Sequence, residues 1–257
     1  MEYVIICSAA FATSTLTLFS GFGLGTLLMP AFAIFFPVDI AITLTAIVHF
    51  LNNLFKFSLL GKYADRNVVL KFGIPAIVAA FLGAWVLIAV SDIPPLISYK
   101  FFGHNATVMP VKLAVALLMI FFALFETIPS FQNVSIDKKY LPLGGLLSGF
   151  FGGLSGNQGA FRSAFLVKCG LSKESFIGTG VIIVCLVDFS RLFVYSVHFA
   201  SVGIQNNISL LLAATLSAFL GAWLGNRLVK KVTMRVVQII VSILLFVIAI
   251  GLGSGVI

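Results

Sequence analysis

The sequence predicts an all-α integral membrane protein with two homologous halves, each holding one glycine-broken helix pair and three transmembrane helices. Three observations lead to this fold class. Apolar residues make up 60% of the 257 residues, charged residues make up 9%, and the mean hydropathy is +1.16, which excludes a water-soluble protein. The hexapeptide AFLGAW occurs twice, at Ala80–Trp85 and at Ala218–Trp223. Glycine-rich stretches also interrupt two apolar segments, one in each half, as in duplicated transporters.

The duplication predicts the domain organisation. Two further pairs of segments match: SGF at Ser20–Phe22 with SGF at Ser148–Phe150, and a polar cluster of Asn52, Asn53 and Lys56 with one of Asp188 and Arg191. We therefore expect a first transmembrane repeat over residues 1–130 and a second over 131–257. Both belong to one membrane domain.

Six apolar segments have a length suited to crossing about 30 Å of hydrocarbon. They are Ile40–Leu60, Val68–Val90, Val111–Phe125, Phe176–Phe199, Ile208–Gly225 and Val236–Leu252. The other two segments, Tyr3–Phe36 and Leu141–Cys169, are interrupted by SGFGLGT at Ser20–Thr26 and by SGFFGGLSGNQG at Ser148–Gly159. Glycine costs a helix about 1 kcal/mol relative to alanine, so we expect non-helical backbone over both interruptions. Such backbone survives at depth only inside protein or beside a water-filled cavity.

Basic residues orient these segments. Four clusters stand out: Lys62 to Lys71, Lys138 and Lys139, Lys168 and Lys173, and Arg227 to Arg235. If both broken segments return to the side from which they entered, every cluster is cytoplasmic, and Asp39, Asp92 and His198 face outward. This favours a re-entrant pair plus three crossings per half, with inverted halves. Eight spans in parallel halves remain the alternative. The net charge of +8 lies mostly in these loops, so it requires no nucleic-acid partner.

The second glycine run, GGLSGNQGAFRSAFL at Gly152–Leu166, has the composition of an anion site. A half-helix that begins near Gly159 exposes unpaired N–H groups and the positive end of its dipole. We predict a substrate site that combines both runs with amides of the first half: Arg162, Asn157, Gln158, Gly156, Gly159, Gly23, Gly25, Thr26, Asn52 and Asn53. Arg162 has two alternative roles, pairing with Asp188 or extending to the lipid headgroups.

Four ionisable residues are candidates for coupling or gating: Asp188, Arg191, Lys56 and His49. Asp188 and Arg191 are three residues apart on one helix face. An internal ion pair, a proton relay and a wall of the substrate site all fit this spacing, and the pair is favoured. For Lys56 we expect a side chain that snorkels to the cytoplasmic surface, and His49 fits a silent hydrogen-bonded role as well as a titrating one. A proton is thus the candidate coupling ion, and passive flux stays open.

Other chemistry lacks its motifs. Cys7, Cys169 and Cys185 have no metal-ligand or disulfide spacing, and neither an H-E-x-x-H motif nor a Walker A motif is present. We therefore expect no enzyme, no metal and no cofactor. Glu2 and the lack of an A-x-A site argue against a cleavable signal peptide. We expect Trp85 and Trp223 to pack within the helix bundle.

The stretches SGFGLGTLLMP and SGFFGGLSGNQGAFRSAFL resemble the duplicated glycine-rich signature of the sulfite exporter TauE/SafE family, and the likeness extends over essentially the whole chain. The second copy departs from that signature at Asn157, Gln158 and Arg162, and it lacks the following proline. The resemblance implies a transporter of small sulfur-containing or organic anions in a bacterial-type plasma membrane. An anion channel and a non-transporting accessory subunit are the alternatives. The oligomeric state stays open.

Overall fold

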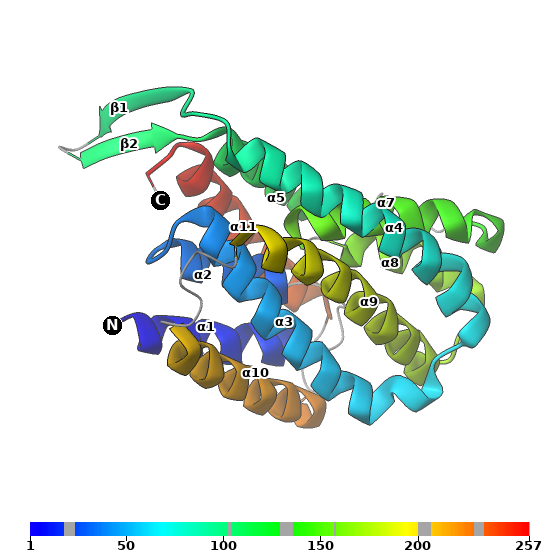
Figure 1. Cartoon of the computed structure of the whole chain (residues 1–257). Helices are drawn as coiled ribbons and strands as arrows, with labels where there is room; N and C mark the ends of the chain where they lie inside the picture. Colours follow the sequence, from blue (N-terminus) through cyan, green and yellow to red (C-terminus); the bar gives the residue numbers. More distant parts are fainter. Residues whose placement is uncertain are drawn as a thin grey trace.

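The computed structural model describes residues 1–17, 24–101, 104–128, 136–156, 158–199, 207–228 and 234–256. They form a bundle of helices with one small sheet (Figure 1). The elements, in chain order, are α1 (Glu2–Thr17), α2 (Leu24–Ala33), α3 (Val38–Leu60), η1 (Gly61–Tyr63), α4 (Arg66–Ser91), β1 (Ile97–Phe101), β2 (His104–Val108), α5 (Pro110–Thr127), η2 (Lys138–Tyr140), α7 (Leu141–Ser155), α8 (Gly159–Leu166), η3 (Val167–Cys169), α9 (Lys173–Phe199), α10 (Ile208–Leu228) and α11 (Met234–Gly253).

The six predicted apolar segments are helices α3, α4, α5, α9, α10 and α11, each within three residues of the predicted ends. Among the described residues, four helices are long and apolar enough to cross a bilayer: Ile40–Tyr63, Arg66–Ser91, Lys173–Ser196 and Ile208–Gly225. Pro110–Phe125 is a shorter apolar helix. These helices identify a multi-pass membrane protein.

The second broken segment is interrupted over fewer residues than predicted. Helix α7 continues to Ser155, Gly156 has a left-handed backbone (φ 79°), and α8 begins at Gly159. The expectation of non-helical backbone from Ser148 to Ser155 was therefore wrong. Gly149 and Gly153 lie within helix α7, where their lack of a side chain allows α7 to pack closely against α4. A Cβ atom at either position would overlap the carbonyl oxygen of Ala76 or Ala80. In the first half, α1 ends at Thr17 and α2 begins at Leu24, and the predicted SGF at Ser20–Phe22 lies outside the described residues.

The two AFLGAW sequences occupy corresponding places. Gly83 of α4 lies against the carbonyl oxygen of Phe150 on α7, and Gly221 of α10 lies against that of Phe11 on α1. Both helix pairs run parallel. Tyr3 and Thr15 of α1 contact Ser209 and Gly225 of α10 in the same order, and Phe72 and Ala80 of α4 lie against Gly145 and Gly153 of α7 in the same order. Small residues therefore let each pair of backbones approach closely, as is common in membranes.

The tryptophans of AFLGAW do not take part in this packing. Trp85 is 63% exposed and Trp223 is 49% exposed on the outside of the bundle, so the expectation that they pack inside was wrong. Trp85 lies in a shallow groove between α4 and α9 that also contains Phe81, Phe193 and Asp92. An amphipathic indole on the outer surface suits a membrane environment.

A small hairpin that the sequence analysis did not predict interrupts the all-α fold. Strands β1 and β2 pair antiparallel, with Ile97 opposite Val108, and they extend from the end of the bundle where both termini lie (Figure 1). The Tyr99 hydroxyl donates to the Ser254 carbonyl at 2.6 Å, and the Thr107 N–H donates to the Gly255 carbonyl at 3.1 Å. The hairpin is thereby attached to the chain that follows α11.

Basic residues gather at the opposite end. The Asp65 N–H donates to Thr179 Oγ1 at 2.9 Å, which places the Lys62 cluster beside the start of α9. The Ile136 N–H donates to the Ala164 carbonyl at 3.1 Å, which brings the segment before η2 to the end of α8. Both ends of the α7–α8 pair therefore lie at the same end of the bundle.

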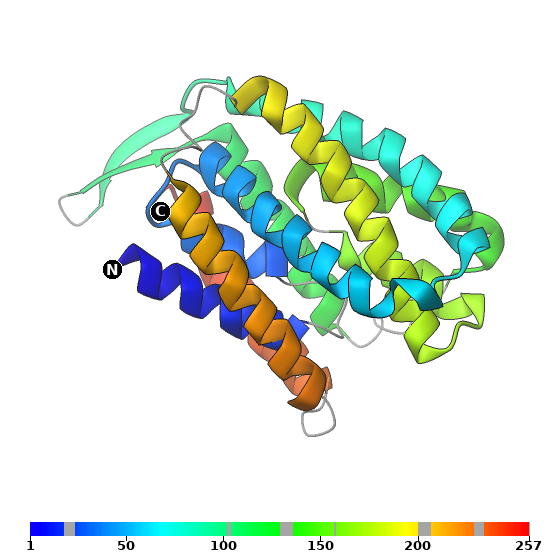
Figure 2. The same cartoon turned by 60° about the horizontal axis from the view of Figure 1, so that its bottom comes forward.

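Helices α3 and α9 contact each other in the middle of the bundle (Figure 2). Nine of the seventeen described buried polar side chains lie on these two helices: Thr43, Thr45, Asn52, Asn53, Lys56, Thr179, Asp188, Ser190 and Arg191. The apolar core surrounds this polar centre, with α5 against α11 on one side and α1 against α10 on another.

Candidate anion site

Arg162 lies in the first turn of α8, inside the protein. Only 4% of the residue is exposed, and its backbone N–H donates to the Gln158 carbonyl at 3.1 Å as part of the helix start. Its side chain runs toward α9, where a Cβ atom on Gly180 would lie 3.3 Å from Arg162 Nε. Gly180 thus leaves room for the guanidinium group, and extension of Arg162 to the lipid headgroups is excluded.

Gln158 caps the same half-helix and is 2% exposed. Its backbone carbonyl also accepts a hydrogen bond from Ser148 Oγ at 3.0 Å, so its position is fixed from both α7 and α8. Neither its amide oxygen nor its amide nitrogen has a hydrogen-bond partner among the described residues. Leaving a buried polar group unsatisfied costs about 1–3 kcal/mol, so this amide is a natural contact for a polar ligand.

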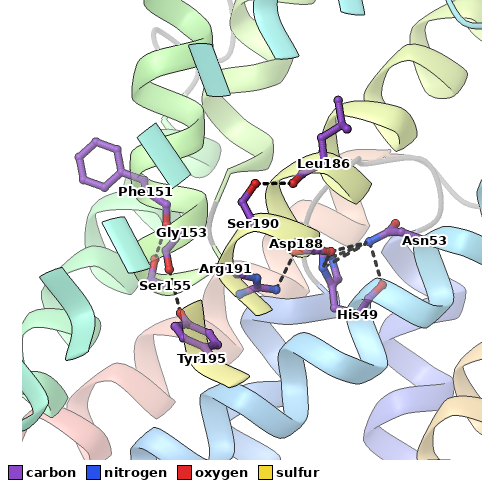
Figure 3. Close-up of polar contacts among 10 residues, drawn as sticks. All are labelled: His49, Asn53, Phe151, Gly153, Ser155, Leu186, Asp188, Ser190, Arg191 and Tyr195. Carbon is purple, nitrogen blue, oxygen red and sulfur yellow. Dashed lines mark hydrogen bonds and ion pairs between the residues drawn. The ribbon is translucent and has the colours of Figure 1, made fainter. Parts of the chain in front are cut away.

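Asp188 lies at the centre of a second polar group on α3 and α9 (Figure 3). It is fully buried. His49 Nδ1 lies 2.6 Å from its Oδ2 atom, and Arg191 Nη2 lies 2.8 Å from its Oδ1 atom. The Asn53 amide donates to Oδ2 at 3.4 Å and to the His49 carbonyl at 2.9 Å. The ion pair that the three-residue spacing predicts is therefore present, and it is joined to the first half through His49 and Asn53.

Lys56 is buried, contrary to the expectation that it reaches the cytoplasmic surface. It is 6% exposed. The reason is that α3 continues to Leu60, whose carbonyl oxygen lies against Gly178 of α9, so the two helices pack together beyond Lys56. The aliphatic stem is thus covered by protein instead of crossing toward the headgroups.

Glycines at both breaks meet this polar centre. A Cβ atom on Gly156 would lie 2.7 Å from Arg191 Nη1, and one on Gly25 would lie 3.6 Å from the His49 ring. The α7–α8 break therefore approaches α9, and the first turn of α2 approaches α3. Gly159 begins α8 as expected. Asn157 and Gly23 lie outside the described residues, as does the side chain of Thr26.

Asn52 contacts a different neighbour from Asn53. It is fully buried, and its Oδ1 atom accepts a hydrogen bond from Ser14 of α1 at 3.4 Å. Its Nδ2 atom has no hydrogen-bond partner within the described part of the chain. The structure thus brings Asn53 to Asp188 but turns Asn52 toward α1.

Tyr195 and Cys185 were not predicted as site residues from the sequence. Tyr195 is fully buried, and its hydroxyl donates to the Gly153 carbonyl at 2.8 Å (Figure 3). It follows Arg191 by four residues and Asp188 by seven, so helical spacing places all three on one face of α9. Cys185 precedes Asp188 by three residues on the same face of α9.

A family model described as "Sulfite exporter TauE/SafE" matches residues 6–252. The chain belongs to the sulfite exporter TauE/SafE family. The match includes both broken helix pairs and every residue of the polar centre, and it confirms the resemblance seen in the sequence. No curated protein and no solved structure matches the chain. This TauE/SafE protein is therefore a member of a family of membrane transporters.

Proposed function

We propose that the protein is a secondary transporter or facilitator that moves a small anion across the membrane by alternating access. The substrate is sulfite, another sulfur oxyanion, an organosulfonate or a related organic anion, the class that the family name indicates. The observation that carries this proposal is Arg162, a cation buried one turn into the half-helix that follows Gln158, whose side-chain amide has no hydrogen-bond partner among the described residues.

The start of α8 supports anion binding in three ways. The first N–H groups of a helix have no partner within that helix. The helix dipole also favours negative charge at this end. Arg162 adds a guanidinium group, whose planar fork suits the oxygen atoms of sulfur oxyanions and carboxylates. Burial strengthens all three effects because the local dielectric constant is low.

Alternating access is supported by the way the two halves interlock. Helix α1 packs on α10, and α7 packs on α4, so the first helix of each proposed repeat (1–130 and 131–257) contacts a helix of the other. The α7–α8 pair returns to the end of the bundle where it starts, as a re-entrant pair would. The described pairings fit inverted halves that rock against each other around a central site.

The Asp188 group is our proposal for the coupling or gating element. Its members come from both halves, His49 and Asn53 from α3 and Asp188 and Arg191 from α9. Motion of one half against the other would change the 2.6 Å contact between His49 and Asp188. Whether a proton moves with the substrate depends on this contact.

The test is uptake of labelled sulfite, thiosulfate, short sulfonates and carboxylates into proteoliposomes. We expect saturable, trans-stimulated flux of at least one anion. Arg162→Ala should reduce that flux at least about tenfold, because a hydrogen bond to a charged group contributes about 1.5–3 kcal/mol. Arg66→Ala is the matched control, since Arg66 is an exposed arginine at the start of α4.

Three outcomes would count against parts of the proposal. Unchanged flux in folded Arg162→Ala protein would remove Arg162 from the site. Flux that rises linearly with concentration and shows no trans-stimulation would indicate an anion channel. A lack of flux for every anion would indicate an accessory subunit.

A further inference from the structure

The side-chain amide of Gln158 lies inside the protein without a hydrogen bond. The residue is 2% exposed, and neither Oε1 nor Nε2 has a partner among the described residues. An unpaired polar group is unfavourable in such a place, because water that would have bonded to it is excluded. An amide kept there despite this cost indicates a ligand that supplies the missing hydrogen bonds.

The packing around Gln158 leaves room for a polar side chain. Its backbone carbonyl accepts hydrogen bonds from Ser148 Oγ at 3.0 Å and from the Arg162 N–H at 3.1 Å. A Cβ atom on Gly152 would lie 3.3 Å from Gln158 Cδ, the carbon that carries both amide atoms, and 2.9 Å from Val187 Cγ1. The missing side chain of Gly152 therefore admits the amide between α7 and α9. An apolar side chain of the same length would fill this space without the cost of an unpaired amide.

The amide oxygen of Gln158 requires a donor. Among the described side chains, two buried acceptor atoms that cannot donate lack a hydrogen-bond partner, Gln158 Oε1 and Asp188 Oδ1. Asp188 Oδ1 faces Arg191 Nη2 at 2.8 Å in the ion pair. For Gln158 Oε1 the described residues supply no donor. The oxygen atoms of an anion accept hydrogen bonds, so they pair with Nε2 of the amide and leave Oε1 unpaired.

Resting on the proposed function, we infer that Gln158 selects oxyanions that carry an O–H or N–H group over anions of equal charge that lack one. Only such a group can donate to Oε1. Arg162 lies one turn further along α8, as the hydrogen bond from its N–H to the Gln158 carbonyl shows. One small molecule can therefore present its anionic group to the arginine and its donor to the amide. A site built to bond a donor rejects analogues without it, because its own buried atom is then left unpaired.

The test compares sulfamate with methanesulfonate, two monoanions that share an SO3 group and differ in an NH2 or a CH3 substituent. Each competes, at constant ionic strength, with proteoliposome uptake of the labelled anion of the panel that is transported best. We expect sulfamate to half-inhibit uptake at a concentration at least about tenfold below that of methanesulfonate. Gln158→Met keeps the length of the side chain and removes both hydrogen-bonding atoms, so it should abolish this preference.

A stability measurement separates a ligand contact from a structural role. Gln158→Met replaces an unpaired buried amide with an apolar side chain, so the unfolding midpoint in detergent without anion should stay the same or rise. Ser155→Ala is the matched control near the same break. Ser155 is 6% exposed, but its hydroxyl donates to the Phe151 carbonyl at 3.1 Å within α7. Its removal should leave the preference for sulfamate unchanged.

Several outcomes would overturn this inference and leave the proposed function standing. They are equal or stronger inhibition by methanesulfonate, competition by neither anion, and a preference that persists in Gln158→Met or is lost equally in Ser155→Ala. Loss of all uptake in folded Gln158→Met protein would make Gln158 a general anion contact, and a marked fall in its unfolding midpoint would make the amide structural. Either result would also overturn the inference. A lack of saturable flux of every anion in the wild-type protein would overturn both proposals.

Discussion

The two close helix pairs of this protein, α4 with α7 and α1 with α10, share their packing but differ in charge. Gly83 and Gly221 each lie against a carbonyl oxygen of the partner helix, at Phe150 and Phe11. The half-helices that follow α1 and α7 are not alike. Helix α8 carries Arg162, whereas α2, with the sequence LGTLLMPAFA, has no charged residue. The repeated AFLGAW sequence thus serves helix packing in both pairs, whereas Arg162 has no charged counterpart on α2.

The largest loss of stability is expected at the buried ion pair between Asp188 and Arg191. Asp188→Asn removes the charge that faces Arg191, leaving a buried cation without its counter-charge. Breaking a buried ion pair in this way costs about 3–5 kcal/mol. We expect a marked fall in the midpoint of thermal unfolding in detergent. Asp92→Asn, at the end of α4, should change it little.

A double-mutant cycle sharpens this test. Asp188→Asn with Arg191→Gln should destabilise the protein by less than the sum of the single changes, because the double variant contains neither charge. Strict additivity would mean that the contact between Asp188 and Arg191 contributes nothing to stability, which would contradict a stabilising ion pair.

The close packing that the two helix pairs share predicts equal losses of stability at Gly83 and Gly221. Gly83→Ala and Gly221→Ala each place a Cβ atom where a backbone carbonyl oxygen of the partner helix lies, and overpacking of this kind costs about 1–3 kcal/mol. We expect similar decreases in unfolding midpoint for both. Leu82→Ala and Leu220→Ala are the controls, since these leucines precede the glycines and are 57% and 61% exposed. A large effect at one glycine and none at the other would break the equivalence of the two pairs.

The smallest loss of stability is expected from the hydrogen bond that joins α9 to α7. Tyr195→Phe removes the hydrogen bond from the Tyr195 hydroxyl to the Gly153 carbonyl. The net contribution of such a bond is about 1 kcal/mol, so the unfolding midpoint should fall slightly. Anion binding should persist, because this hydrogen bond joins α9 to α7 and does not involve Arg162. Loss of transport in stable Tyr195→Phe protein would place this residue in the transport cycle.

Much of the scaffold was predictable from sequence, because apolar segments of membrane length have few alternatives. The ends of α3 and α9 illustrate this, since Lys62 and Lys173 lie just outside or at the ends of the apolar runs. The break at Gly156 was also predictable from the concentration of glycine and amide residues. The position of Arg162 within an apolar segment favoured its burial, and extension to the lipid headgroups was the open alternative.

The remaining features depend on partners far away in the sequence. Gly149 and Gly153 predict a break in the helix when the sequence is read alone, but in the structure they allow close packing against α4. Lys56 has the position of a snorkelling residue, but α9 packs against α3 beyond it. The hairpin at Ile97–Val108 is short, and only its contacts with Ser254 and Gly255 show why it is ordered there.

The most direct measurement of the central claim is binding of a labelled anion, taken from the panel above, to the purified protein in detergent. Scintillation proximity with wild-type, Arg162→Ala and Arg66→Ala protein separates binding from the later steps of transport. Our account predicts saturable binding that Arg162→Ala weakens at least about tenfold and Arg66→Ala leaves unchanged. Equal binding by all three proteins, with Arg162→Ala folded, would contradict the claim that the buried arginine of α8 holds the transported anion.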